Sequence, residues 1–149
     1  MNEKDSTIQS PVLSRSQEKV ANRPVMNIVS ETVHLHVGGI LFPELDQADF
    51  TGPFEVLSRL PNSTFHIVAK TKDPVRDAKG LMLLPEKLMS ESPPLDLLLV
   101  PGGAGVNAIM EDEATLAFVR GQAARARLIF SVCTGALVIG AAGLLTKAK

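Results

Sequence analysis

Four short apolar segments, separated by helical or polar stretches, constrain the fold of this chain most strongly. We expect strands at residues 33–42, 64–69, 96–100 and 128–132. Runs of this length are typical of strands in a parallel sheet that is buried on both faces. Apolar residues at helical spacing predict helices at 54–60, 106–110, 113–126 and 136–145. Strands that alternate with helices predict a three-layer α/β/α sandwich of the flavodoxin-like type, with a mostly parallel sheet.

The connecting segments give weaker predictions. Residues 44–53 include Gly52 and Pro53 and predict a turn that leads into the helix at 54–60. Residues 71–92 carry many charges, Gly80 and two prolines, which indicates a short hairpin or loop around 81–84. The segment 136–145 is apolar on nearly all sides and predicts a buried helix.

With 149 residues, the chain is long enough for one domain, which we place at 33–149. Residues 1–32 are polar, mixed in charge and interrupted by Pro11 and Pro24, so we interpret them as a disordered leader. This leader contains no apolar run of signal-peptide or membrane-spanning length. We therefore expect a cytoplasmic protein that does not bind membranes.

Composition excludes several classes of partner and cofactor. The formal net charge of -1 and the absence of Trp and Tyr give no basis for nucleic-acid binding, so we expect a small-molecule substrate. A single cysteine excludes an intrachain disulfide and a zinc site built from several thiolates. His34 and His36 share one face of a strand, but no third ligand is evident nearby. We expect neither a metal nor an organic cofactor.

Three segments of chemical interest follow predicted strands, namely 44–53, 101–105 and 133–135. In open α/β sheets, ligands bind beyond the carboxyl ends of the strands. Cys133 directly follows one strand and precedes a helix, with Gly135 two residues on, which is the arrangement of a nucleophile elbow. Backbone N–H groups at the helix start would favour its thiolate form. A lone cysteine is more often a small buried apolar residue, but this placement favours a reactive one.

Other residues at this edge have two interpretations each. Asp49 is either a helix cap or turn former, or the acid/base that a thiolate needs; Glu44 and Asp46 are rival carboxylates. Gly102 and Gly103 form either a tight turn or a pair of N–H donors for developing negative charge. Thr134 is either a first-turn helix residue or a group that holds a bound anion or water.

Histidine positions limit the chemistry available to the thiol. All three histidines of the chain precede residue 67, and none adjoins Cys133. A Cys–His pair would need His34, His36 or His66 to reach the site, and all three fall in predicted strands. Hydrolysis through a Cys–His pair is therefore not expected.

The motifs LFPELDQADFTGP at 41–53, LLLVPGGAGV at 97–106 and SVCTGALVIGAAGLL at 131–145 resemble the ThiJ/PfpI superfamily, relatives of the class I glutamine amidotransferases. The resemblance runs from about Val33 to the last residue and looks closest to the cyclohexyl-isocyanide hydratases. It implies a hydro-lyase without cofactor, and a homodimer in the full-length family. It also implies Cys133 as nucleophile, Asp49 as acid/base and Thr134 as the neighbouring hydroxyl.

The implied reaction is hydration of an isocyanide to an N-substituted formamide through a cysteine thioimidate. We expect Phe50 and Phe54 to line the pocket for an apolar substituent. The superfamily domain continues beyond the position of Lys149, so the resemblance also implies that the domain at 33–149 is incomplete. Rival interpretations are the ligand-sensing domain of an AraC-type transcription regulator, or a glyoxalase-like or redox-protective protein in which Cys133 is oxidised.

Overall fold

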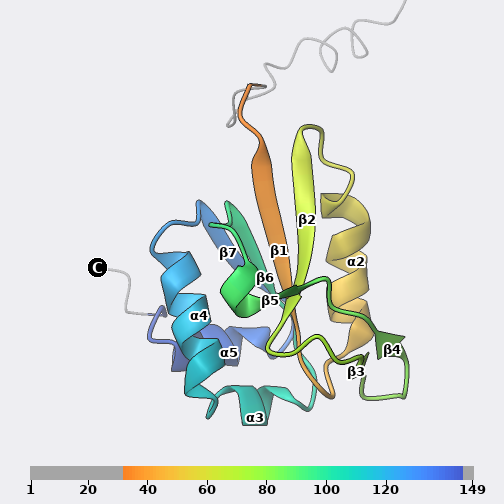
Figure 1. The fold of residues 1–149 in the computed structure, drawn as a ribbon. Helices are drawn as coiled ribbons and strands as arrows, with labels where there is room; N and C mark the ends of the chain where they lie inside the picture. Colours follow the sequence, from red (N-terminus) through yellow and green to blue (C-terminus); the bar gives the residue numbers. More distant parts are fainter. Residues whose placement is uncertain (1–31, 146–149) are drawn as a thin grey trace, which may run out of the picture. The chain divides into compact units, whose positions relative to one another are not determined.

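A five-stranded parallel sheet forms the centre of the protein (Figure 1). The structure is a computed structural model, and it describes residues 32–145. In spatial order the strands are β5 (Lys87–Leu88), β2 (Ser63–Ala69), β1 (Leu35–Leu41), β6 (Leu97–Val100) and β7 (Leu128–Ser131). The four strands expected from the sequence are all present, each within two residues of its expected ends. The leader interpretation concerns residues 1–32, of which residues 1–31 lie outside the described range.

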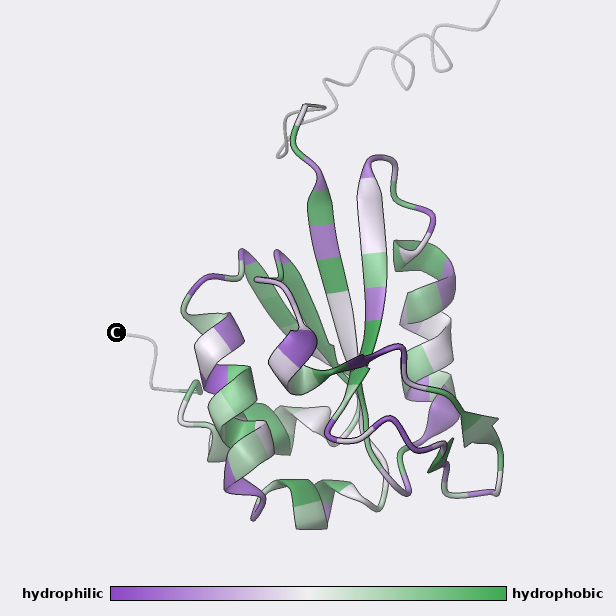
Figure 2. Cartoon of the chain, viewed as in Figure 1, coloured by the Kyte–Doolittle hydropathy of each residue, from purple (hydrophilic) through white to green (hydrophobic). Residues whose placement is uncertain are grey.

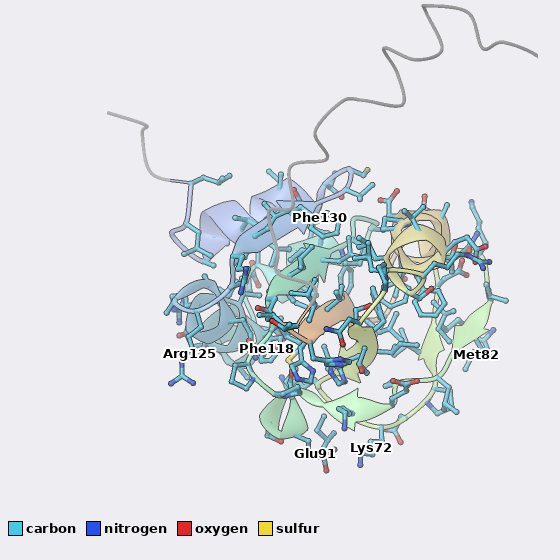
Figure 3. All side chains as sticks on the ribbon, turned by 90° about the horizontal axis from the view of Figure 1, so that it is seen from above. Lys72, Met82, Glu91, Phe118, Arg125 and Phe130 are labelled. Carbon is cyan, nitrogen blue, oxygen red and sulfur yellow. The ribbon has the colours of Figure 1, made fainter. Side chains whose placement is uncertain are left out.

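Helices cover both sides of this sheet. They are α2 (Gln47–Leu57), α3 (Val106–Ile109), α4 (Glu113–Ala123) and α5 (Gly135–Ala141), with a short 3-10 turn, η1, at Met89–Glu91. The view from above shows α2 and α4 on opposite sides of the strands (Figure 3). The topology requires this arrangement. The step from β1 to β2 and the step from β6 to β7 run in opposite directions, and parallel crossovers are right-handed. The three-layer, flavodoxin-like prediction is confirmed.

The core lies between the sheet and these helices. Strands β6 and β7 are hydrophobic along most of their length, as their green colour shows (Figure 2). Leu98 and Leu99 of β6 are both fully buried, because successive side chains of a strand point to opposite faces and both faces are covered. Gly39 of β1 lets α2 approach closely. A Cβ atom there would lie 2.6 Å from the Phe50 ring and 3.1 Å from the Phe65 ring.

The turn predicted at 44–53 is wrong, since α2 begins at Gln47 and continues through Gly52 and Pro53 to Leu57. Two features start the helix earlier than the sequence pattern indicated. The Asp46 side chain accepts a hydrogen bond from the Ala48 amide at 3.0 Å, which caps the first turn. Burial of Phe50 against the sheet then fixes the next turn.

The hairpin expected around 81–84 is present. Strand β3 (Val75–Arg76) pairs with β4 (Met82–Leu83) in antiparallel register, and Gly80 takes a positive φ of 102° in the connection. Asp77 fixes this turn by accepting the backbone N–H groups of Lys79 and Leu81, each at 2.8 Å. These bonds close the polar turn between β3 and β4.

The prediction that the last helix is buried on nearly all sides is wrong for one face of α5. Val138 and Ile139 are buried, but Leu137 is 51% exposed, and Leu145 just beyond the helix is 65% exposed. The buried pair packs toward the sheet, because α5 contacts β6 and β7. Within residues 32–145 we find no helix with the length and apolarity needed to cross a bilayer.

Candidate active site

Three loops meet at the carboxyl edge of the sheet, because β1, β6 and β7 are parallel neighbours. The chain leaves β1 toward β2 and leaves β6 toward β7, so the loops after β1 and β6 diverge from a point between these strands. Such a switch point is where open α/β sheets bind their ligands. The three segments singled out from the sequence all lie here.

The loops after β1 and β6 are held together by backbone hydrogen bonds. The Asp46 amide donates to the Gly102 carbonyl at 2.9 Å, and the Gly105 amide donates to the Glu44 carbonyl at 3.1 Å. Gly103 makes this approach possible with a φ of 127°, and a Cβ atom on it would lie 2.4 Å from the Asp46 nitrogen. Backbone hydrogen bonds therefore join the two loops to each other beside β7.

Cys133 occupies the sharp turn between β7 and α5 with a φ of 53°, a left-handed conformation that is strained for a residue with a Cβ atom. Its side chain is exposed. Gly135 allows the turn to press against β6, since a Cβ atom there would lie 2.2 Å from the Val100 carbonyl oxygen. This is the geometry of a nucleophile elbow, in which a strained turn presents the side chain above the sheet edge.

Asp49 and Thr134 converge on the backbone of the loop after β6. The Gly102 amide donates to Asp49 Oδ2 at 3.2 Å, and the Gly103 amide donates to Thr134 Oγ1 at 3.1 Å. A Cβ atom on Gly102 would lie 2.8 Å from each of these two oxygens. The carboxylate and the hydroxyl are therefore separated by less than twice that distance, and Thr134 directly follows Cys133 in the chain.

The N–H groups of Gly102 and Gly103 both have side-chain partners. Each N–H makes its hydrogen bond to a side chain, Asp49 for the first and Thr134 for the second. In this arrangement the amides hold the acid/base candidate and the hydroxyl in place. That these N–H groups stabilise negative charge near the sulfur, one of the two interpretations from the sequence, stays a prediction.

Beside Cys133 lies an open hollow of about 340 Å³. The residues that line it are Asp46, Gly103, Ala104, Val106, Asn107, Cys133, Thr134 and Leu137. Sequence reasoning gave no site role to Ala104, Val106, Asn107 or Leu137, although Ala104 lies in the segment 101–105 that it singled out. One signal was available for Leu137, because it lies in the first turn of the helix that directly follows Cys133.

Phe50 and Phe54 do not line this hollow, in contrast to the expected pocket. Their rings stack with centroids 6.3 Å apart, and both pack edge-on against Phe65 of β2. Phe50 is only 3% exposed. The earlier start of α2 explains the difference, since a helix over this segment turns both rings toward the sheet.

Glu44 and Asp46, the rival carboxylates, are both exposed. Glu44 has a φ of 60° and its amide donates to the Arg76 carbonyl at 2.9 Å, which connects the loop to the β3–β4 hairpin. Asp46 caps α2 through Oδ1 and also borders the hollow. Neither is held against the loop after β6 by its side chain as Asp49 is.

The histidines lie toward the opposite end of the sheet. His36 Nδ1 and His66 Nε2 are 2.9 Å apart, and the two rings stack. Six residues separate His36 from Phe42, which is roughly 20 Å of strand at ~3.3 Å per residue. Burial, and then the neighbouring His36, lower the pKa of His66. Among residues 32–145, no group of three or more His, Cys, Asp or Glu could hold a metal ion.

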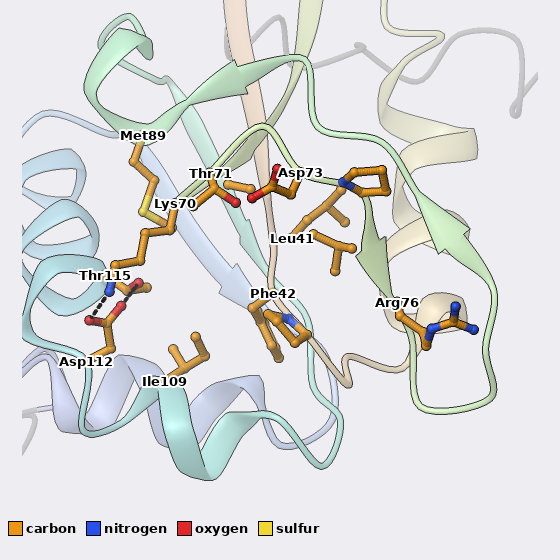
Figure 4. A pocket seen from close by; sticks show the side chains of 14 residues that line it. Leu41, Phe42, Lys70, Thr71, Asp73, Arg76, Met89, Ile109, Asp112 and Thr115 are labelled. Carbon is orange, nitrogen blue, oxygen red and sulfur yellow. Dashed lines mark hydrogen bonds and ion pairs between the residues drawn. The ribbon is translucent and has the colours of Figure 1, made fainter.

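A second hollow of about 370 Å³ lies at the same sheet edge, on the other side of the loop after β1 (Figure 4). Phe42 and Ile109 supply apolar walls, and a Lys70–Asp112 ion pair of 2.7 Å crosses its side. The hydrogen bond from Lys70, and then the one from Thr115, lower the pKa of Asp112. None of Cys133, Asp49 and Thr134 lines this space.

The fold and the site define an α/β protein with an exposed cysteine on a strained strand-to-helix turn at the switch point of a parallel sheet. The sequence model of the DJ-1/PfpI family matches residues 37–149, and the chain belongs to this family. It is 53% identical over 111 residues to isonitrile hydratase of Pseudomonas putida, an alignment that covers 74% of this chain and 49% of the relative.

Two further similarities bear on function. A ThiJ/PfpI family protein from Pseudomonas syringae superposes with a TM-score of 0.74 at 37% identity, over 83% of this chain and 52% of that protein. The HTH-type transcriptional regulator Rv1931c of Mycobacterium tuberculosis is 42% identical over 54 residues, which is 36% of this chain and 21% of the regulator. The chain spans about half the length of both Pseudomonas proteins.

Proposed function

We propose that this chain carries the reactive site of an isocyanide hydratase, which converts an isocyanide and water into an N-substituted formamide. The observation that carries the proposal is the convergence of three groups. Cys133 is exposed and takes a strained left-handed conformation, and Thr134 directly follows it. The Thr134 hydroxyl and the Asp49 carboxylate both bind the loop after β6 and lie close to each other there. The 53% identity to isonitrile hydratase supports the same reaction class.

In the first step, the Cys133 thiolate attacks the terminal carbon of the isocyanide, which is electrophilic, and a C–S bond forms. Protonated Asp49 delivers its proton to that same carbon. The product is a thioimidate in which the substrate carbon carries one hydrogen, a sulfur and a double bond to nitrogen. The hydrogen bond from the Gly102 amide holds Asp49 in position for this transfer.

In the second step, a water molecule held by Thr134 and Asp49 adds to the thioimidate carbon. One proton of the water passes to the substrate nitrogen and the other returns to Asp49. The C–S bond then breaks, which releases the formamide and restores the Cys133 thiolate. The step requires no electron acceptor or donor, because the substrate carbon and water supply every atom of the product.

The test is formation of N-cyclohexylformamide from cyclohexyl isocyanide by the purified protein, followed by NMR. Cys133→Ala should abolish turnover, and Asp49→Asn should lower kcat by about 10²–10⁴, the usual contribution of a positioned acid/base. Asp73→Asn, which neutralises an exposed carboxylate of the second hollow, is the matched control and should keep full activity. Formamide production that survives Cys133→Ala rules out the thioimidate route.

A second candidate is a ligand-sensing domain, favoured by the 42% identity to part of a transcriptional regulator. In that role the hollow beside Cys133 binds a small molecule without turning it over. The same experiment separates the two functions. Saturable protection of Cys133 from alkylation by an isocyanide, without release of formamide, supports the sensor and contradicts the hydratase.

A further inference from the structure

The hollow beside Cys133 is lined by an apolar residue whose exposure core packing does not explain. Leu137 is about half exposed, although its neighbours Val138 and Ile139 are buried in the same helix. Ala104 and Val106 line the same hollow, and Val106 also belongs to the core. Leu137 lies in the first turn of α5 and shares the hollow with Cys133, so its side chain borders the space that a group attached to the sulfur would occupy.

The rim of the same hollow carries a negative charge. Asp46 borders it, and the Asp46 Oδ1 atom caps α2 by accepting from the Ala48 amide, which fixes the carboxylate at this position. Neither lysine nor arginine lines the hollow. An anionic group near the sulfur would therefore meet a carboxylate of the same sign, with no cationic side chain lining the hollow, which is unfavourable at low ionic strength.

We propose that this hollow is the specificity site of the protein: Leu137, with Ala104 and Val106, accepts a neutral apolar substituent, and Asp46 excludes anionic ones. Resting on the proposed function, the preferred substrates are uncharged aliphatic or alicyclic isocyanides. With this assignment, the substituent lies against Leu137 of α5, Val106 of α3 and Ala104 just before α3. It leaves Phe50 and Phe54 as core residues.

The apolar part can be tested without turnover, because Cys133 is the single cysteine of the chain. We compare its alkylation rates by N-cyclohexylmaleimide and N-methylmaleimide. Leu137→Ala should lower the cyclohexyl-to-methyl rate ratio about fivefold. This is less than the roughly tenfold or greater discrimination that one methylene gives in an enclosed apolar pocket, because the hollow is open. Leu128→Ala is the matched control, since Leu128 is 52% exposed and does not line the hollow.

A second variant tests whether the change in ratio comes from lost apolar contact or from a folding defect. Leu137→Gln keeps the length of the side chain and its helix propensity but makes the end polar. It should reduce the ratio as Leu137→Ala does, at a melting temperature close to that of the wild type. An unchanged ratio in both variants overturns the assignment of Leu137.

The charge part is tested with iodoacetate and iodoacetamide, which differ by one negative charge. Asp46→Asn keeps a side chain that caps helices well, so α2 should remain intact. It should raise the iodoacetate-to-iodoacetamide rate ratio several-fold at low salt, and the gain should shrink at 1 M salt. Asp73→Asn should leave the ratio unchanged. Equal ratios for wild type and Asp46→Asn overturn the role of Asp46.

Substrate kinetics then distinguish this inference from the proposed function. If the protein hydrates isocyanides, Leu137→Ala should lower kcat/KM for cyclohexyl isocyanide relative to methyl isocyanide by a similar factor. Absence of hydration in the wild type, with the alkylation selectivity intact, contradicts the hydratase and supports the selective hollow. Hydration that persists and does not depend on Leu137 supports the hydratase and contradicts the specificity role of Leu137.

Discussion

The amide of Gly103 donates a hydrogen bond to Thr134 Oγ1 at 3.1 Å, so the residue after Cys133 is held against the loop of the neighbouring strand. The bond joins β6 to the turn after β7 and restrains the elbow from outside its own segment. The preceding amide, that of Gly102, holds Asp49 in the same way. Two consecutive N–H groups therefore set the positions of both candidate partners of Cys133.

Gly102→Ala should disrupt this arrangement directly. A Cβ atom at this position would lie 2.7 Å from the Thr134 nitrogen and 2.8 Å from the Asp49 and Thr134 side-chain oxygens, so these groups must move apart. We expect a loss of at least ~10²-fold in kcat/KM for hydration, because small displacements of catalytic groups have effects of this size.

Gly121→Ala is the control for that variant, since a Cβ atom on this helical glycine would meet nothing within 4 Å. It should raise the free energy of unfolding by about 0.5–1 kcal/mol through helix propensity and leave kcat/KM unchanged. If Gly102→Ala keeps wild-type activity in the formamide assay, this result contradicts the close approach of Asp49 and Thr134 to Gly102.

Thr134 should act through its hydroxyl oxygen. Thr134→Val removes the acceptor of the Gly103 N–H while keeping the β-branched shape, and we expect hydration to fall about tenfold or more. Thr134→Ser keeps the oxygen and should retain activity within a few-fold. Hydrogen exchange of the Gly103 amide should accelerate in Thr134→Val alone, which reports the lost bond independently of turnover.

The left-handed conformation of Cys133 should lower the free energy of unfolding of the protein. Glycine adopts a φ of 53° without the steric penalty that a Cβ atom introduces. We expect Cys133→Gly to be more stable than Cys133→Ala by about 1 kcal/mol, at the lower end of the strain typical of such positions. Urea unfolding of the two inactive variants provides the comparison, and equal stabilities indicate an unstrained turn.

Stability should decline in mild acid because of His66. Burial, and then His36, lower the pKa of His66 below its usual value of 6.5, with Lys87 and His34 acting in the same direction and Glu86 opposing them. The unfolded chain therefore binds this proton more readily than the folded one. The stabilising contribution is complete above about pH 6.5 and is lost as the pH falls toward the lowered pKa.

Urea unfolding between pH 7.5 and 5 measures this slope. His66→Gln removes the titrating ring and should flatten the dependence, whereas His34→Gln, on the exposed side of the cluster, should retain most of it. A slope that is the same in wild type and His66→Gln assigns the acid sensitivity to other groups.

Several features of this protein follow from the sequence alone because they are local. Short apolar runs define the strands, and the position of Cys133 between β7 and α5 defines the elbow. The order of strands and helices is sufficient to bring Asp49, Gly102 and Thr134, which follow β1, β6 and β7, to one edge, because parallel strands end on the same side of a sheet.

Other features depend on contacts between distant segments, and only the tertiary structure decided them. Packing of Phe50 against β1 and β2 began α2 earlier than its glycine and proline indicated, and it placed both phenylalanines in the core. The glycine amides found side-chain partners on other elements. The hollow beside Cys133 is likewise bounded by residues brought together from three elements, and no single segment of sequence records that proximity.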